Sequence, residues 1–127
     1  MILYCASDLL WASKIKGTGD ALGIPCRPVR NADMLAARLA DSDVRALIVD
    51  LEAGDAALAL IVQIRAHGPE SPASDRPPAR VIAFGPHVDK DRLQAARDAG
   101  ADAVYTRGAF ADRLPDLLTA LESGARV

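Results

Sequence analysis

The feature that most constrains the fold is an uninterrupted apolar run, Ala46-Leu47-Ile48-Val49, which ends in Asp50. Such a run is expected of a central strand in a parallel sheet, because helices cover a sheet of this kind on both faces. Open parallel sheets bind their ligands at the carboxyl ends of their strands. The run therefore predicts a buried central strand and places Asp50 at the candidate functional edge.

Short apolar strands alternate with helical patterns along the chain. We expect strands at 2–5, 25–30, 46–49, 80–84 and 103–106. We expect helices at 9–22, 56–66, 89–99 and 110–122, and a short helix that Asn31 or Asp33 caps and that runs through Ala40. This alternation predicts a parallel sheet with right-handed crossovers and helices on both faces. Pro25 and Pro28 place the second strand at an edge, because proline cannot donate to a neighbouring strand. The predicted fold is α/β: a flavodoxin-like (βα)5 three-layer sandwich with strand order 2-1-3-4-5.

Several local signals support this division of the chain. Asp8 is a good N-cap for the helix at 9–22, and Gly23 suits the position that ends it. The proline- and serine-rich segment 68–79 predicts a flexible loop before the fourth strand. Trp11, near the start of the first helix, is interpreted as a core residue.

Composition narrows the choice of function. The chain has 127 residues, half of them apolar, and a formal net charge of −2. We expect one domain over 1–127, no nucleic-acid partner, no membrane partner, no signal peptide and a cytoplasmic location. Cys5 and Cys26 fall at opposite edges of the predicted sheet, which is too far apart for a disulfide. They are interpreted as small buried hydrophobic residues.

Three segments carry a resemblance to a known family: A-L-I-V-D-L from residue 46, V-I-A-F from residue 81, and A-A-R-D-A-G-A-D-A-V-Y-T-R-x-x-F over 95–110. Together with the first strand and its polar corner, they resemble the response-regulator (CheY-like) receiver domain of two-component signal transduction. The resemblance covers nearly the whole chain. Segment 95–110 is the most specific part and is similar to the family's A-x-x-A-G-A-D-D-Y-L-x-K-P-F. The resemblance implies that Asp50 occupies the place of the phosphoacceptor.

The other positions that serve phosphorylation in receivers are changed. Ala6 and Ser7 stand where the resemblance implies two acidic residues that hold Mg²⁺. Gly85 replaces a serine or threonine, and Arg107 replaces a lysine. The aromatic switch residue falls on Val104. Phosphoryl transfer to a carboxylate brings anions together and depends on a metal to neutralise them, so these losses point to a degenerate receiver, or pseudo-receiver.

The predicted fold brings a set of polar and small residues to the carboxyl edge of the sheet: Ser7, Asp8, Asp50, Gly85, His87, Thr106 and Arg107. Asp8 and Asp50 are the only acids left in this crest pocket, so at best they form a weak Mg²⁺ site. We expect no catalytic residue, no cofactor and no other metal. Our hypothesis is that Arg107 or His87 pairs directly with Asp50 in place of the metal. Simpler interpretations are a structural Asp50 at the strand end and a solvated His87 in a loop.

The leading functional prediction is a non-enzymatic signalling module that acts through protein–protein interaction without Mg²⁺-dependent phosphorylation. It would bind a protein partner or itself, as a homodimer, through a surface that includes Arg92, Arg97, Val104, Phe110 and Arg113. One alternative is a genuine receiver in a phosphorelay, phosphorylated on Asp50 with Mg²⁺. Another is a flavodoxin-like domain that binds a small ligand at the crest pocket.

Overall fold

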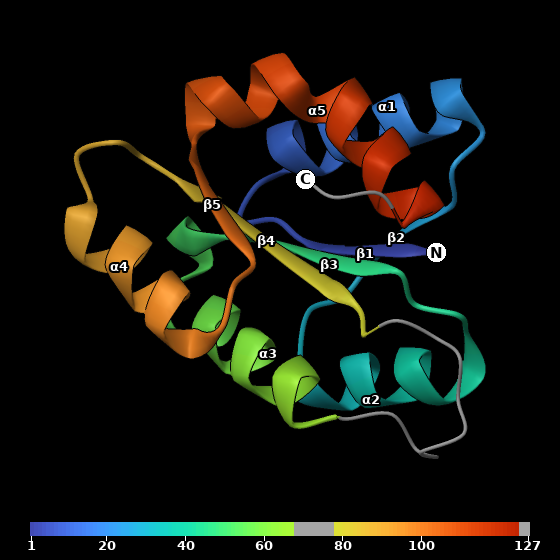
Figure 1. The fold of residues 1–127 in the computed structure, drawn as a ribbon, viewed down its shortest axis with the longest axis horizontal. Helices are drawn as coiled ribbons and strands as arrows, with labels where there is room; N and C mark the ends of the chain where they lie inside the picture. Colours follow the sequence, from blue (N-terminus) through green and yellow to red (C-terminus); the bar gives the residue numbers. More distant parts are fainter. Residues whose placement is uncertain (68–77, 125–127) are drawn as a thin grey trace.

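A computed structural model describes residues 1–67 and 78–124, so most of the predicted loop at 68–79 lies outside the described residues. Within them, five parallel strands form one sheet in the order β2-β1-β3-β4-β5, as predicted (Figure 1). The strands are β1 (Ile2–Cys5), β2 (Cys26–Pro28), β3 (Ala46–Asp50), β4 (Arg80–Gly85) and β5 (Ala103–Thr106). The helices are α1 (Leu9–Leu22), α2 (Ala32–Asp41), the 3-10 turn η1 (Leu51–Ala53), α3 (Asp55–Ala66), α4 (Lys90–Ala99) and α5 (Arg107–Ser123).

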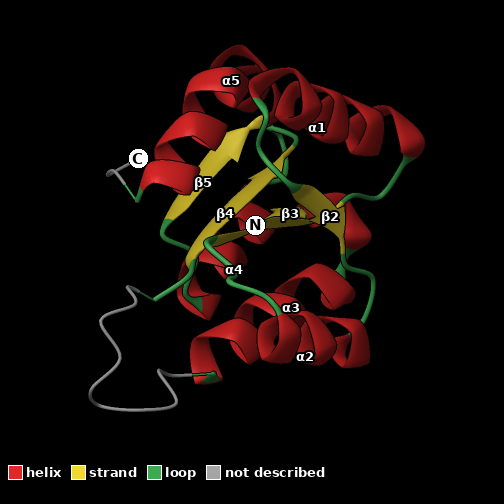
Figure 2. Cartoon of the chain, turned by 90° about the vertical axis from the view of Figure 1, so that its right-hand side faces the viewer, coloured by secondary structure: helices red, strands yellow, loops and turns green. Residues whose placement is uncertain are grey.

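Helices cover both faces of the sheet. Helices α1 and α5 lie together on one face, and α2, α3 and α4 lie on the other (Figures 1 and 2). Successive side chains of β3 are buried on alternate faces: Ile48 packs beneath α1 and α5, whereas Leu47 and Val49 pack against the opposite helices. Every residue of β3 is buried, which confirms the central strand predicted from the apolar run.

The layer beneath α1 and α5 contains a cluster of three aromatic rings. Phe84 of β4 stacks on Phe110 of α5 with ring centroids 4.1 Å apart, and Trp11 of α1 lies 4.8 Å from Phe84. The interpretation of Trp11 as a core residue is confirmed. The prediction of Phe110 as an interface residue is wrong, because its side chain is completely buried in this cluster.

Capping decides where α1 and α5 begin. The Asp8 carboxylate accepts a hydrogen bond from the Trp11 N–H at 2.9 Å, and Gly23 ends α1 with φ of 72°, as predicted. Helix α5 begins at Arg107, earlier than the predicted start at Phe110. The reason is that the Thr106 hydroxyl accepts a hydrogen bond from the Ala109 N–H and so caps the helix directly at the end of β5.

Two further predictions concern the cysteines and the membrane. Cys5 and Cys26 are free and buried, and Cys26 pairs in register with Ile2 at the opposite end of β1 from Cys5. The structure therefore confirms the prediction that they form no disulfide. No helix within 1–67 or 78–124 is long and apolar enough to cross a membrane.

Candidate functional site

Asp50 is the last residue of β3 and the centre of the candidate site. Its side chain has no solvent exposure, and it is the one charged side chain that is buried in the described part of the chain. Burying a carboxylate is costly unless hydrogen bonds compensate for the water that it loses. The partners of Asp50 therefore determine what the site can do.

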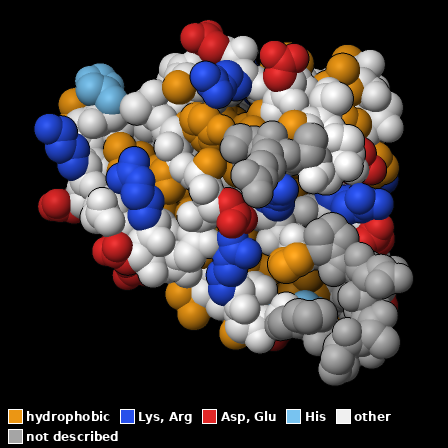
Figure 3. Space-filling view, viewed as in Figure 1, with side chains coloured by type: hydrophobic (Ala, Val, Ile, Leu, Met, Phe, Trp, Pro, Cys, Tyr) orange, Lys and Arg blue, Asp and Glu red, His pale blue; other side chains and the backbone are white. Residues whose placement is uncertain are grey.

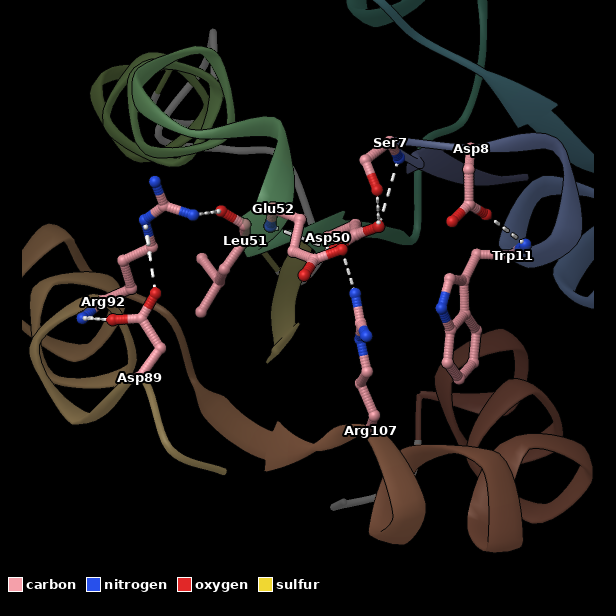
Figure 4. Close-up of polar contacts among 9 residues, drawn as sticks. All are labelled: Ser7, Asp8, Trp11, Asp50, Leu51, Glu52, Asp89, Arg92 and Arg107. Atoms are coloured by element: carbon pink, nitrogen blue, oxygen red, sulfur yellow. Dashed lines mark hydrogen bonds and ion pairs between the residues drawn. The ribbon is translucent and has the colours of Figure 1, made fainter. Parts of the chain in front are cut away.

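Three neutral donors hold the Asp50 carboxylate (Figure 4). The Ser7 N–H donates to Oδ2 at 3.1 Å, and the Ser7 hydroxyl donates to the same oxygen. The Glu52 N–H donates to Oδ1 at 3.0 Å. Both carboxylate oxygens are thus engaged by groups that carry no charge.

The predicted cation is not among these partners. The Arg107 guanidinium pairs through Nη2 with the Glu52 carboxylate (Figure 4). His87 is exposed in the turn after β4. The hypothesis that Arg107 or His87 pairs directly with Asp50 is therefore wrong, because Arg107 pairs with Glu52 instead and His87 is exposed to solvent. Both members of the Arg107–Glu52 pair keep about a third of their side-chain surface exposed, at 35% and 38%.

Asp8, the other acid of the predicted crest pocket, uses its carboxylate for structure. Oδ1 accepts the Trp11 N–H and caps α1, as Figure 4 shows. The N-cap interpretation is confirmed. The part of the chain that the structure describes holds no group of three or more His, Cys, Asp or Glu residues that could bind a metal together.

Gly85 and Thr106 are paired in register at the ends of β4 and β5. A Cβ atom at Gly85 would lie 3.2 Å from the Cβ of Leu51, closer than side chains normally approach. A serine or threonine here would therefore have to displace Leu51. The Thr106 hydroxyl caps α5 through the Ala109 N–H.

Sequence reasoning missed the residues of the turn that follows Asp50. Glu52 binds Asp50 through its N–H and Arg107 through its carboxylate. The Leu51 carbonyl accepts a hydrogen bond from Nη1 of Arg92, a residue of α4, at 3.5 Å. An acid two positions after Asp50, in a segment that leaves the sheet, is the signal that could have identified Glu52.

Cys5 ends β1 beside this site. Burial raises the pKa of its thiol above the ordinary value of 9.0, and the nearby charge of Asp50 raises it further. A thiol with a raised pKa is a poor nucleophile at neutral pH, since the thiolate is the reactive form. Cys5 is therefore a packing residue.

Only some of the residues predicted to contact a partner are exposed to solvent. Arg92, Arg97 and Arg113 are exposed, whereas Val104 is half-buried and packs against the core on the α2, α3 and α4 side. Positive and negative side chains are interspersed over the face shown in Figure 3. Such mixed charge suits a protein contact better than binding to a polyanion.

Comparison with known proteins identifies the fold. No protein-family model matches the sequence, and no curated protein matches it. Among solved structures, the receiver domain of NtrX from Brucella abortus is 21% identical, with a TM-score of 0.74 and coverage of 98% of this chain and 100% of that one. A response regulator from Thermotoga maritima is 20% identical, with a TM-score of 0.71 and 96% of each chain covered.

A third structure agrees with these two. The isolated REC domain of RcsB from Salmonella enterica serovar Typhimurium is 20% identical, with a TM-score of 0.70, and the match covers 99% of this chain and 90% of that one. Against a longer structure of NtrX from Brucella abortus, the match covers 26% of that chain. The chain therefore has the receiver fold, which is the flavodoxin-like fold predicted from the sequence.

Proposed function

We propose that this chain is a receiver-like signalling module that acts through protein–protein contact and is not phosphorylated in a Mg²⁺-dependent reaction. The observation that supports the proposal best is the state of Asp50. Its carboxylate is completely buried, and Ser7 and the Glu52 N–H engage both of its oxygens.

The chemistry of receivers explains why this observation matters. A carboxylate attacks a phosphoryl group only if the repulsion between the two anions is neutralised, usually by a divalent cation. Mg²⁺ requires carboxylate and water oxygens in octahedral geometry. Ser7 stands where the resemblance implies an acid, and its hydroxyl donates to Asp50. The residues present do not fit a Mg²⁺ site, so the proposal includes no step through the metal.

The proposed contact surface lies on α4 and the exposed side of α5. Arg97 and Arg113 are exposed there, and acidic residues of both helices, Asp98 and Asp112, are exposed as well. A surface with both signs of charge can match a protein partner or a second copy of the chain. Charge reversal in Arg97→Glu should weaken such a contact, as measured by sedimentation equilibrium for the homodimer.

The first test uses chemical phosphodonors. The protein is incubated with acetyl phosphate and Mg²⁺, and separately with beryllofluoride and Mg²⁺, and intact mass and fluorescence of the single tryptophan, Trp11, are recorded. We expect no phosphoryl adduct and no change in fluorescence. A phosphoryl adduct that is absent from Asp50→Asn would overturn the proposal in favour of a genuine receiver.

A matched gain-of-function variant makes a negative result informative. The double substitution Ala6→Asp and Ser7→Asp supplies the two acids that the resemblance implies at these positions. Magnesium titration should change Trp11 fluorescence in this variant and leave it unchanged in the wild type. An equal response in both proteins would contradict the proposal that the residues at positions 6 and 7 are what prevent metal binding.

A further inference from the structure

Two arginines from different helices hold the turn that follows Asp50 (Figure 4). From α4, Nη1 of Arg92 donates to the carbonyl oxygen of Leu51 at 3.5 Å. From α5, the Arg107 guanidinium pairs with the carboxylate of Glu52. Neighbouring residues of one short turn are therefore tied to two different helices.

The turn itself has little freedom to move independently of Asp50. The Glu52 N–H donates to Asp50 Oδ1 at 3.0 Å, and the Leu51 side chain is 1% exposed. Leu51 also packs so closely against Gly85 of β4 that a Cβ atom there would lie 3.2 Å from the Leu51 Cβ. A shift of the Asp50 carboxylate or of the end of β4 must therefore move the turn.

The arginine contacts, by contrast, are weak enough to open. The side chains of Arg92, Glu52 and Arg107 are all partly exposed, and ion pairs between such groups are screened by water and salt. When it leaves Leu51, Arg92 still has the carboxylate of Asp89, the N-cap residue of α4, at 3.4 Å. Arg92 can therefore separate from the turn without losing its only anionic partner.

We propose that Leu51, Glu52, Arg92 and Arg107 form a two-arginine clamp that couples the position of the Asp50 turn to the first turns of α4 and α5. The consequence for signalling rests on the proposed function, in which α4 and α5 contact a partner. The coupling itself is a property of the fold.

The two sides of the clamp differ chemically, which separates their effects. Arg92 binds a backbone carbonyl, so no change of a charged side chain in the turn can remove its acceptor. Arg107 binds a carboxylate, so Glu52→Gln removes the charge that holds it. Glu52→Gln should therefore loosen α5, whereas Arg92→Met should loosen α4.

Hydrogen exchange of the whole chain, measured by mass spectrometry without any phosphodonor, tests this. In Gly85→Ala, where the new Cβ presses on Leu51, amides in the first turns of both α4 and α5 should exchange about two- to five-fold faster, the range expected for the loss of a weak ion pair. The control is Gly17→Ala in α1, because a Cβ atom at Gly17 meets nothing within 4 Å. Exchange in α4 and α5 should be unchanged in this variant.

Substitutions at the partly exposed residues Arg92 and Glu52 test the clamp even if Gly85→Ala does not fold. Arg92→Met should accelerate exchange at the start of α4 only, and Glu52→Gln at the start of α5 only, by the same factor. The clamp is refuted if neither variant changes exchange in its helix, or if each changes both helices equally. Because no phosphodonor is present, refuting the clamp would not change the conclusion from the acetyl phosphate experiment. A phosphoryl adduct in that experiment would likewise not refute the clamp.

Discussion

Two aspartates at opposite ends of the sheet are held in opposite ways. Asp102 precedes β5 at the amino end, where its Oδ2 accepts the Val81 N–H at 2.8 Å and pairs with the Arg65 guanidinium. Asp50 ends β3 at the carboxyl end and has only neutral donors, from Ser7 and Glu52. Asp102 is partly exposed and has a cation, whereas Asp50 is buried and has none among the described residues.

The two aspartates therefore differ in what they contribute to stability. Asp102 ties α3 to the start of β4 and to the segment before β5, since Arg65 also donates to the Gly100 carbonyl at 2.7 Å. Stability alone explains that arrangement. A buried carboxylate without a cation is costly even when neutral donors hold it. Asp102 therefore stabilises the fold, whereas the burial of Asp50 opposes stability.

The largest effect on stability should come from the amino end. Asp102→Ala removes the acceptor of the Val81 N–H and the anion beside Arg65, so the free energy of unfolding should fall by about 2 kcal/mol. Urea denaturation followed by circular dichroism measures it. Asp116→Ala, at an exposed position of α5, is the control and should stay within about 0.5 kcal/mol of the wild type. An equal loss of unfolding free energy in the two variants would contradict the structural role of Asp102.

Ser7→Ala should have the next largest effect. It removes the hydroxyl donor to Asp50 while the charge stays buried, which should cost about 1.5 kcal/mol of unfolding free energy, as for other hydrogen bonds to charged groups. The cost should shrink by about half when Ser7→Ala is combined with Asp50→Asn, as a double-mutant cycle would show. Strictly additive losses would mean that Ser7 does not compensate the charge of Asp50.

The neutral variant Asp50→Asn should change the free energy of unfolding by less than about 1 kcal/mol, because relief from burying a charge offsets the weaker hydrogen bonds. Asp102→Asn is the matched substitution at the amino end, where the carboxylate has a cation to lose. It should be the more destabilising of the two. If thermal or urea denaturation showed Asp50→Asn to be the more destabilising substitution, the distinction between the two aspartates would be contradicted.

The sequence predicted the fold well because its strongest signals are local and repeated. The apolar run before Asp50, the two prolines near Cys26 and the caps at Asp8 and Gly23 each act within a few residues, and all point to the same strand order. The end of β5 was harder to predict. Thr106 can extend a strand or cap a helix, and its bond to Ala109 decides for the cap.

The candidate site was predicted less completely because its contacts join distant segments. Sequence reasoning brought Ser7, Asp50 and Arg107 to one edge correctly but paired the arginine with the wrong acid. The choice between Asp50 and Glu52 depends on side-chain reach and on backbone donors in the turn, which a pattern of residue types does not contain. Phe110 was misplaced for a similar reason: the periodicity of α5 could not reveal the stack with Phe84.

The smallest expected effect is a change in the titration of Cys5. Burial and then the charge of Asp50 raise its pKa above 9.0, so the folded chain keeps a proton that the unfolded chain releases. The contribution to stability is complete below pH 9.0 and is lost as pH rises through the folded-state pKa. The free energy of unfolding should therefore fall as the pH rises above 9.0.

Asp50→Asn removes the second cause and leaves burial, so the pKa of Cys5 should drop part of the way toward 9.0. Cys26 is an internal control, because burial is the main cause of its raised pKa and Asp50 is not among the causes. Nuclear magnetic resonance of ¹³C-labelled cysteine follows both thiols in one sample. A drop at Cys5 alone would show that the Asp50 charge acts locally in the folded protein, whereas equal shifts at both cysteines would show that the substitution had loosened the whole core.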